Sequence, residues 1–233
     1  MPSSNLDPSR LEVLFEDNHL LVLNKPAMLP TMGTPGGSET LLTVAKRYVK
    51  DRYDKPGNVY LGVVSRLDAP VTGVVLFART SKAARRLTEQ FRDGSVEKRY
   101  WALVSGRVQP AEDEYADWVA SDERHRRMRI VGSELSGAKL AQLRYRRLRS
   151  WQGNSLLEIR LLTGRKHQIR LQLAHHGFPI AGDRKYGSED PFPRGIALHA
   201  RRLRIQHPVG AHDFEAIAPL PTYWPLAESD VTG

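Results

Sequence analysis

An uninterrupted apolar run of strand length, at residues 74–78, limits the possible folds of this chain more than any other stretch. Its sequence, Val-Val-Leu-Phe-Ala, follows a turn marked by Pro70 and Gly73. This pattern predicts a fully buried strand. Asp68 and Arg66 stand just before the turn, where a rigid buried strand would hold their side chains in place. Taken alone, such a carboxylate is more often a turn residue that bonds to nearby N–H groups.

Strand-like runs outnumber helical patterns along the rest of the chain. Two of them flank Glu16-Asp17-Asn18 and predict a hairpin, at residues 11–15 and 20–23. Further strands are predicted at residues 98–104, 156–162, 196–205 and 214–218. Helical spacing predicts helices at residues 41–53, from an N-cap at Ser81 to a stop at Gly94, and from Thr163 to His176. Because hairpins outnumber βαβ units, we expect an α+β fold with a mixed, mostly antiparallel central sheet flanked by helices.

The charge balance favours a polyanionic partner. The chain has 35 Lys and Arg against 26 Asp and Glu, which gives a net charge of +9 and a pI near 9.9. Such an excess suits nucleic acid or an anionic membrane surface. Two stretches, residues 124–129 and 144–149, are rich in arginine. One charge run is usually a solvated face, but two in a basic chain make an RNA-facing surface an equal alternative.

Several classes of protein are disfavoured by what the sequence lacks. The absence of cysteine excludes disulfides, thiolate zinc sites and a thiol nucleophile, and the eight histidines show no metal-ligand spacing. No apolar run approaches the roughly 18 residues of a membrane span, and the N-terminus lacks the apolar core of a signal peptide. We therefore expect a cytoplasmic protein. Residues 1–10 are polar and are expected to be flexible, with one domain, single or two-lobed, from residue 11 to 233.

The segment that begins at Thr163 suggests an anion site. Free N–H groups at a helix start, together with Arg165 and Lys166, would form a positive pocket for a phosphate or a carboxylate. The alternative is a capped helix with exposed basic residues, which is the more common arrangement when this pattern occurs alone.

Four groups of motifs, in one order along residues 11–205, carry a more specific signal. They are Leu20-Leu21-Val22-Leu23-Asn24-Lys25-Pro26, then Arg66-Leu67-Asp68 with Thr72-Gly73, then Lys98-Arg99-Tyr100-Trp101-Ala102-Leu103-Val104, and finally Thr163-Gly164-Arg165-Lys166-His167-Gln168-Ile169-Arg170 with Gly182-Asp183-Arg184-Lys185-Tyr186-Gly187. Together they resemble the RluA family of pseudouridine synthases. The resemblance spans nearly the whole chain, which makes it more specific than any single motif.

This resemblance implies that uridine is isomerised to pseudouridine in ribosomal or transfer RNA, with no cofactor and no metal. It also implies a pseudouridine synthase catalytic domain from residue 11, without the N-terminal S4-type domain of some members, acting on RNA as a monomer. Asp68 would be the essential carboxylate that begins cleavage of the glycosidic bond. Tyr100 would stack on the base and assist proton removal from it.

Further site residues follow from the same resemblance. Arg165 would pair with Asp68 and keep it ionised, because a neighbouring guanidinium depresses the pKa of a carboxyl group. Arg66 would occupy the space left when the uridine flips out of its stack. RNA contacts are expected from three more residues of the same motif, His167, Gln168 and Arg170.

The chain departs from the family pattern at the carboxylate turn. Ser65 stands where the family usually has His, and Val71-Thr72 stand where it usually has Thr-Ser. Two alternative functions therefore stay open. One is an RNA-binding protein or chaperone in which Asp68 is structural. The other is a hydrolase with Asp68 as nucleophile, which is disfavoured because phosphatases of that kind carry a second aspartate where this chain has Pro70.

Overall fold

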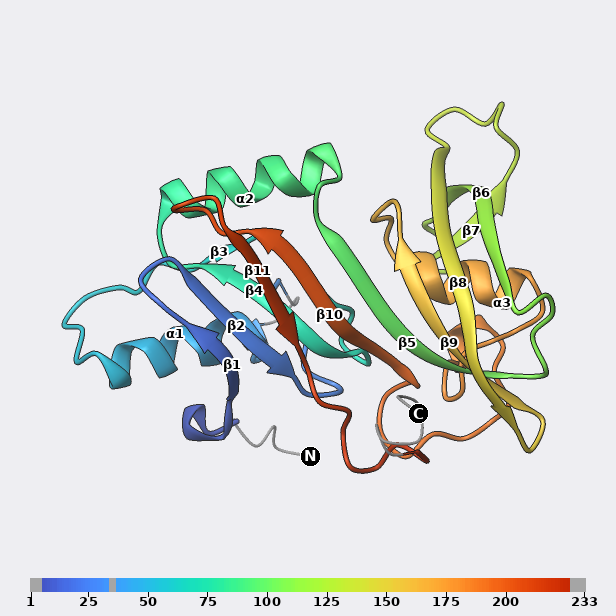
Figure 1. The fold of residues 1–233 in the computed structure, drawn as a ribbon, viewed down its shortest axis with the longest axis horizontal. Helices are drawn as coiled ribbons and strands as arrows, with labels where there is room; N and C mark the ends of the chain where they lie inside the picture. Colours follow the sequence, from blue (N-terminus) through green and yellow to red (C-terminus); the bar gives the residue numbers. More distant parts are fainter. Residues whose placement is uncertain (1–5, 34–36, 227–233) are drawn as a thin grey trace. The chain divides into compact units, whose positions relative to one another are not determined.

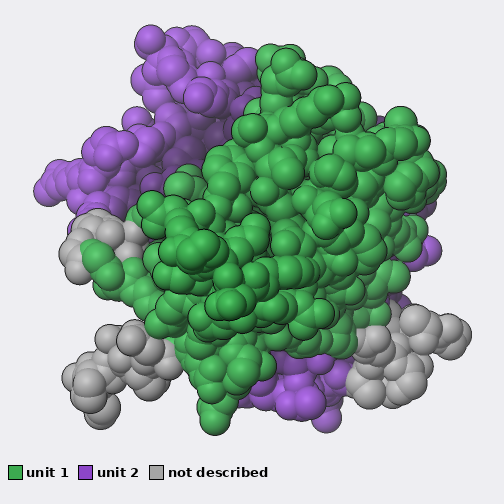
Figure 2. All heavy atoms as spheres, turned by 90° about the vertical axis from the view of Figure 1, so that its left-hand side faces the viewer, with its two compact units in different colours: residues 1–96, 200–219 green, residues 97–199, 220–233 purple. Residues whose placement is uncertain are grey.

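The computed structural model describes residues 6–33 and 37–226. The chain divides into two compact units, residues 1–96 with 200–219 and residues 97–199 with 220–233 (Figure 2). The domain expected from residue 11 onward is thus built of two units, and residues 34–36 and 227–233 of that range lie outside the described part. No helix in the described part of the chain is long and apolar enough to cross a membrane.

The first unit is a sheet with a helix on each face. Its strand order is β1-β2-β4-β10, with β3 paired to β4 and β11 paired to β10 (Figure 1). The strands are β1 (Glu12–Glu16), β2 (Leu20–Lys25), β3 (Gly62–Val63), β4 (Thr72–Ala78), β10 (Leu198–Gln206, of which residues 200–206 belong here) and β11 (Asp213–Ile217). The helices are α1 (Leu41–Arg52) and α2 (Ser81–Asp93). This arrangement confirms the predicted hairpin and both predicted helices.

The strand β4 is buried along its whole length, as residues 74–78 predict. Val74 and Leu76 pack with residues of α2 such as Leu87. Val75 and Phe77 point the other way and pack with residues of α1. Because alternate side chains of a strand face opposite sides, a sheet covered by helices on both faces requires an uninterrupted apolar run.

The helix α2 starts at Ser81, the residue predicted to be its cap, and the cap lies one residue earlier. Thr80, not Ser81, is the N-cap, and its side chain accepts a hydrogen bond from Ala83 N at 3.1 Å. The helix ends at Gly94, in the left-handed conformation with φ +79°, as its sequence predicts.

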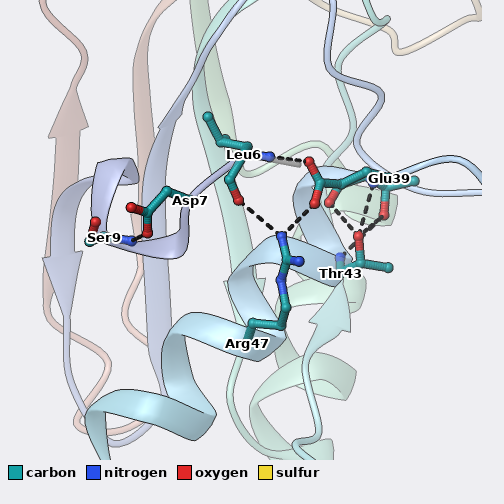
Figure 3. Close-up of polar contacts among 7 residues, drawn as sticks. Leu6, Asp7, Ser9, Glu39, Thr43 and Arg47 are labelled. Carbon is teal, nitrogen blue, oxygen red and sulfur yellow. Dashed lines mark hydrogen bonds and ion pairs between the residues drawn. The ribbon is translucent and has the colours of Figure 1, made fainter. Parts of the chain in front are cut away.

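Residues 6–10 are held against α1, contrary to the expectation of a flexible N-terminus (Figure 3). Leu6 N donates to Glu39 Oε2 at 2.6 Å, and Arg47 Nη2 donates to Leu6 O at 2.9 Å and to Glu39. Asp7 then caps a 3-10 helix, η1 (Pro8–Arg10). A single arginine–glutamate pair thus fixes backbone that sequence polarity alone suggests is free. Residues 1–5, also part of that expectation, lie outside the described residues.

The second unit is a five-stranded antiparallel sheet with one helix. Its order is β5-β9-β8-β6-β7. The elements are β5 (Glu97–Ser105), β6 (Glu112–Asp122), β7 (Arg127–Val131), β8 (Lys139–Trp151), β9 (Asn154–Leu161), α3 (Gln168–His175) and the 3-10 helix η3 (Arg184–Tyr186). Leu171 of α3 packs on Val119 and Ala141 of the sheet. In the first unit the pairs β1–β2, β2–β4, β3–β4 and β10–β11 are antiparallel as well, which confirms the α+β class with a mostly antiparallel sheet.

The helix predicted from Thr163 begins five residues later, at Gln168. The Gln168 side chain accepts from Thr163 Oγ1 at 2.8 Å and from Arg165 N at 2.9 Å, and donates to Gln142 O at 2.9 Å. These hydrogen bonds hold residues 163–167 in a loop conformation. His167 follows in the left-handed conformation with φ +53° and has no side-chain cap. The predicted anion pocket requires a helix that begins at Thr163. Because α3 begins at Gln168, the free N–H groups of a helix start are not located at Thr163.

Candidate active site

Asp68 lies on the segment that joins β3 to β4, and this segment is bonded to buried elements on both sides. Ser65 Oγ accepts from Leu76 N at 3.0 Å, which ties the segment to β4. Thr31 Oγ1 accepts from Leu67 N at 3.0 Å and donates to Leu67 O at 2.9 Å. The turn then closes with Val71 N donating to Asp68 O at 3.1 Å. The backbone that carries the half-buried Asp68 is thus fixed before and after it.

A buried lysine completes these supports. Lys25, at the end of β2, is 0% exposed, and its Nζ donates to Pro26 O at 2.9 Å, Leu29 O at 2.8 Å and Ala69 O at 3.0 Å. Three carbonyl acceptors match the three protons of the charged ammonium. Burial lowers the pKa of Lys25 to about 7, and the negative charge of Asp68 opposes this shift. Lys25 therefore joins β2 to the residue that follows Asp68.

Sequence reasoning does not single out Lys25 for this role, although it lies in one of the quoted motifs. The signal that could have found it is its position at the end of an apolar strand, because a buried lysine must be bonded to acceptors. The identity of those acceptors, in residues distant in sequence, is a tertiary property.

The serine that departs from the family pattern has a structural partner. We expect Ser65→Ala to lower the free energy of unfolding by about 1–2 kcal/mol, because the buried Leu76 N–H would lose its acceptor. Urea denaturation measures the change. Ser81→Ala is the matched control, since the exposed Ser81 hydroxyl has no partner among the described residues, and a shift below about 0.5 kcal/mol is expected there. Equal shifts in the two variants would contradict the role of Ser65.

The predicted site residues are distributed over both units. Arg66, exposed, and Asp68 belong to the first unit. Tyr100, half-buried on β5 opposite Ile159, belongs to the second, as does Arg165. Arg165 is exposed, and its Nε donates to Leu140 O at 2.9 Å. The pairing of Arg165 with Asp68 joins residues of two different units and stays a prediction.

The second unit brings two more of the predicted residues, His167 and Arg170, together around Tyr186. The Tyr186 hydroxyl accepts from Met128 N at 3.1 Å and lies 2.8 Å from His167 Nδ1. Arg170 makes a buried bidentate ion pair with Asp183, at 2.7 and 2.9 Å, and its guanidinium lies 5.1 Å from the centre of the Tyr186 ring. Sequence reasoning assigns no role to Asp183 or Tyr186, because residues 182–187 read only as a turn-rich motif.

Two of the predicted RNA contacts are buried inside the second unit. Gln168 is 3% exposed and Arg170 is 5% exposed, and the polar groups of both are bonded inside the unit. We interpret them as residues that position the loop and α3. A direct contact of either with RNA stays a prediction.

The two arginine-rich stretches differ in structure. Residues 124–129 form the tip and one strand of the β6–β7 hairpin, where Arg124, Arg126 and Arg129 are exposed. Lys185 Nζ donates to Arg126 O at 2.6 Å and so connects the hairpin to η3. Residues 144–149 lie within β8, where side chains alternate between the two faces. Only the first stretch includes a hairpin tip.

Comparison with known proteins agrees with this fold and these motifs. A family model described as RNA pseudouridylate synthase matches residues 19–175. The chain is 36% identical over 228 residues to the ribosomal large subunit pseudouridine synthase D of Xylella fastidiosa, covering 91% of this chain and 66% of that protein. It is 33% identical over 229 residues to the synthase of the same name from Pseudomonas aeruginosa, covering 91% of this chain and 68% of that protein. The chain thus spans about two thirds of the length of these relatives.

Solved structures show the same fold. Human RNA pseudouridylate synthase domain containing 4 superposes with a TM-score of 0.77 at 24% identity, over 91% of this chain and 89% of that one. The human domain-containing protein 1 gives 0.74 at 23% identity, over 92% and 85%. The family model and the relatives above 30% identity establish that the chain belongs to the family of RNA pseudouridylate synthases.

Proposed function

We propose that the chain is an RNA pseudouridine synthase that isomerises specific uridines, with Asp68 as its essential carboxylate. The observation that carries this proposal is the rigid support of Asp68. Thr31 bonds the backbone of Leu67 and the buried Lys25 bonds Ala69 O, on either side of Asp68. Ser65 Oγ ties the same segment to Leu76 N of β4. A reacting group whose position is fixed beforehand incurs little reorganisation cost during the reaction.

The chemistry requires one well-placed carboxylate and no redox step. The C1′–N1 bond of the uridine breaks, the base turns, C1′ bonds to C5, C5 loses its proton and N1 gains one. Asp68 would promote departure of the base either by attack at C1′ or by taking a proton from the sugar. The uridine must first leave its stack, at about a few kcal/mol, and Arg66 would fill the vacated space.

The deciding measurement is tritium release from RNA that carries C5-labelled uridine. The C5 hydrogen leaves only if the base is rejoined through carbon, so release distinguishes an isomerase from the alternative RNA chaperone. Binding of RNA without release would favour the chaperone.

The RNA target is proposed from the names of the relatives, which act on the ribosomal large subunit. We expect the chain to act in the cytoplasm as a monomer on large-subunit ribosomal RNA. Chemical mapping of pseudouridines in ribosomal and transfer RNA, from cells with and without this gene, would identify the class of target and the modified nucleotides.

The exposed arginines of the β6–β7 hairpin are expected to contact RNA phosphates. Replacing Arg124, Arg126 and Arg129 with Gln should lower the slope of log affinity against log salt by about 0.7 to 0.9 for each phosphate that is no longer neutralised. Salt titrations of RNA binding measure this. Arg202→Gln with Arg204→Gln is the control, because these arginines pair with Glu215 and Asp213. An unchanged slope in the hairpin variant would mean that the hairpin arginines are solvent-exposed and do not contact RNA phosphates.

Tyr100 is proposed to stack on the base and to help remove its proton. Tyr100→Phe keeps the ring, so RNA affinity should change little while turnover falls at least about tenfold. Tyr100→Ala should also weaken binding, by about 1–3 kcal/mol. Single-turnover rates and binding constants separate these effects. Full turnover in the Phe variant would remove the hydroxyl from the mechanism.

A further inference from the structure

Three arginines lie directly opposite one another across three strands of the second unit. Arg160 of β9 is the register partner of Arg144 on β8 and of Arg99 on β5. Because register partners point to the same side of a sheet, the three side chains share one face. Tyr100 follows Arg99 in β5, so it points to the other face. This arginine row is therefore distinct from the part of the candidate active site on β5.

The middle arginine of this row has no counter-charge. Arg99 pairs with Glu97 at 2.5 Å and with Glu158 at 2.9 Å, and Arg144 pairs with Glu114 at 2.6 Å. Arg160 is exposed, and no hydrogen bond or ion pair reaches it from the residues that the structure describes. Arg160 therefore lies opposite two like charges without a counter-charge of its own, and such an arrangement in a sheet costs the unliganded protein stability.

The neighbouring row on the same face shows the compensated arrangement. There Arg146 of β8 has Glu112 and Glu158 as its register partners, and its Nη2 lies 3.4 Å from Glu158 Oε1. Charges of opposite sign thus alternate across that row. A hollow of about 410 Å³ is lined by residues of both rows, and its lining includes the carboxylates of Glu112, Asp113, Glu114 and Glu158.

We propose that Arg99, Arg144 and Arg160 form a phosphate-binding site for the RNA backbone on this outer face. A phosphate placed at Arg160 supplies the counter-charge that this arginine lacks, and guanidinium groups match phosphate oxygens in geometry. The side chains of Arg99 and Arg144 are 31% and 60% exposed, which suits a long polyanion that lies across a surface. This inference depends on the proposed function in one respect, namely that RNA is the partner.

The test compares two variants that remove the same charge from the same face. Arg160→Gln should weaken RNA binding about fivefold to tenfold at about 0.1 M salt and lower the salt slope by about 0.7 to 0.9. Arg146→Gln, the matched control from the compensated row, should weaken binding less than about twofold. Arg160→Lys should keep most of the salt slope because it keeps the charge. The maximal rate with saturating RNA should be unchanged in all three variants.

Thermal unfolding without RNA supplies an independent measurement. Arg160→Gln should leave the melting temperature unchanged or raise it, because it relieves repulsion, whereas a structural arginine would lower it. Equal losses of affinity in Arg160→Gln and Arg146→Gln would overturn the site, as would a wild-type protein without affinity for RNA. A wild-type protein that binds RNA without releasing tritium would contradict the proposed isomerase while leaving the affinity comparison decisive for this site.

Discussion

Asp68→Asn should reduce tritium release from C5-labelled RNA below detection while RNA affinity stays close to that of the wild-type protein. The amide keeps the size and shape of the side chain but loses the charge, so it can neither attack C1′ nor take a proton from the sugar. The chain has no cysteine to act in its place. Removal of a group of this kind commonly costs several orders of magnitude in rate.

The structure suggests that this variant folds. The supports of the segment use backbone atoms of Leu67 and Ala69 and the carbonyl of Asp68, all of which an asparagine leaves in place. Asp51→Asn, on the exposed side of α1, removes one negative charge elsewhere and should keep full activity. Equal tritium release from Asp68→Asn and the wild-type protein would reject Asp68 as the essential carboxylate.

The second large effect is expected at the turn that leads into β4. Gly73 has φ +110°, and a Cβ added there would lie 2.3 Å from Ala200 O and 2.6 Å from Ala200 N. These are backbone atoms of β10 and cannot turn aside as a flexible side chain would. Gly73→Ala should therefore lower the free energy of unfolding by at least about 3 kcal/mol, from backbone strain and overpacking together.

Urea or thermal denaturation measures this loss, and Gly57→Ala provides the control. Gly57 has an ordinary φ, and a Cβ built there meets nothing within 4 Å. Its substitution should change stability by less than about 1 kcal/mol. Similar stability in the two variants would show that the close approach of β4 to β10 at Gly73 does not limit the fold.

The elements whose signal is local could be predicted from the amino-acid sequence. The apolar run at residues 74–78 required a strand buried on both faces, and helices on both sides of the sheet cover it. The spacing of apolar residues located α1 and α2, and Gly94 marked the end of α2. The order of the motifs identified the family, because each motif is contiguous in the chain.

Features that depend on partners distant in sequence became visible in the folded chain. The observed start of α3 is Gln168 and not the predicted Thr163. The side chain of Gln168 bonds Gln142 O, which lies 26 residues away in the chain. Lys25 became a support of the Asp68 segment because it reaches Ala69 O across 44 residues. Leu6 was fixed through Glu39 and Arg47.

The same reason applies to the charged stretches. Residues 124–129 and 144–149 look alike as sequence, yet the first includes the tip of a hairpin and the second lies wholly within one strand. The arginine row appeared only once the register placed Arg160 between Arg99 and Arg144. The composition gives the number of charges, whereas the strand register determines which charges face one another. The register is set by pairing between strands that lie far apart in the chain, so the sequence alone does not reveal it.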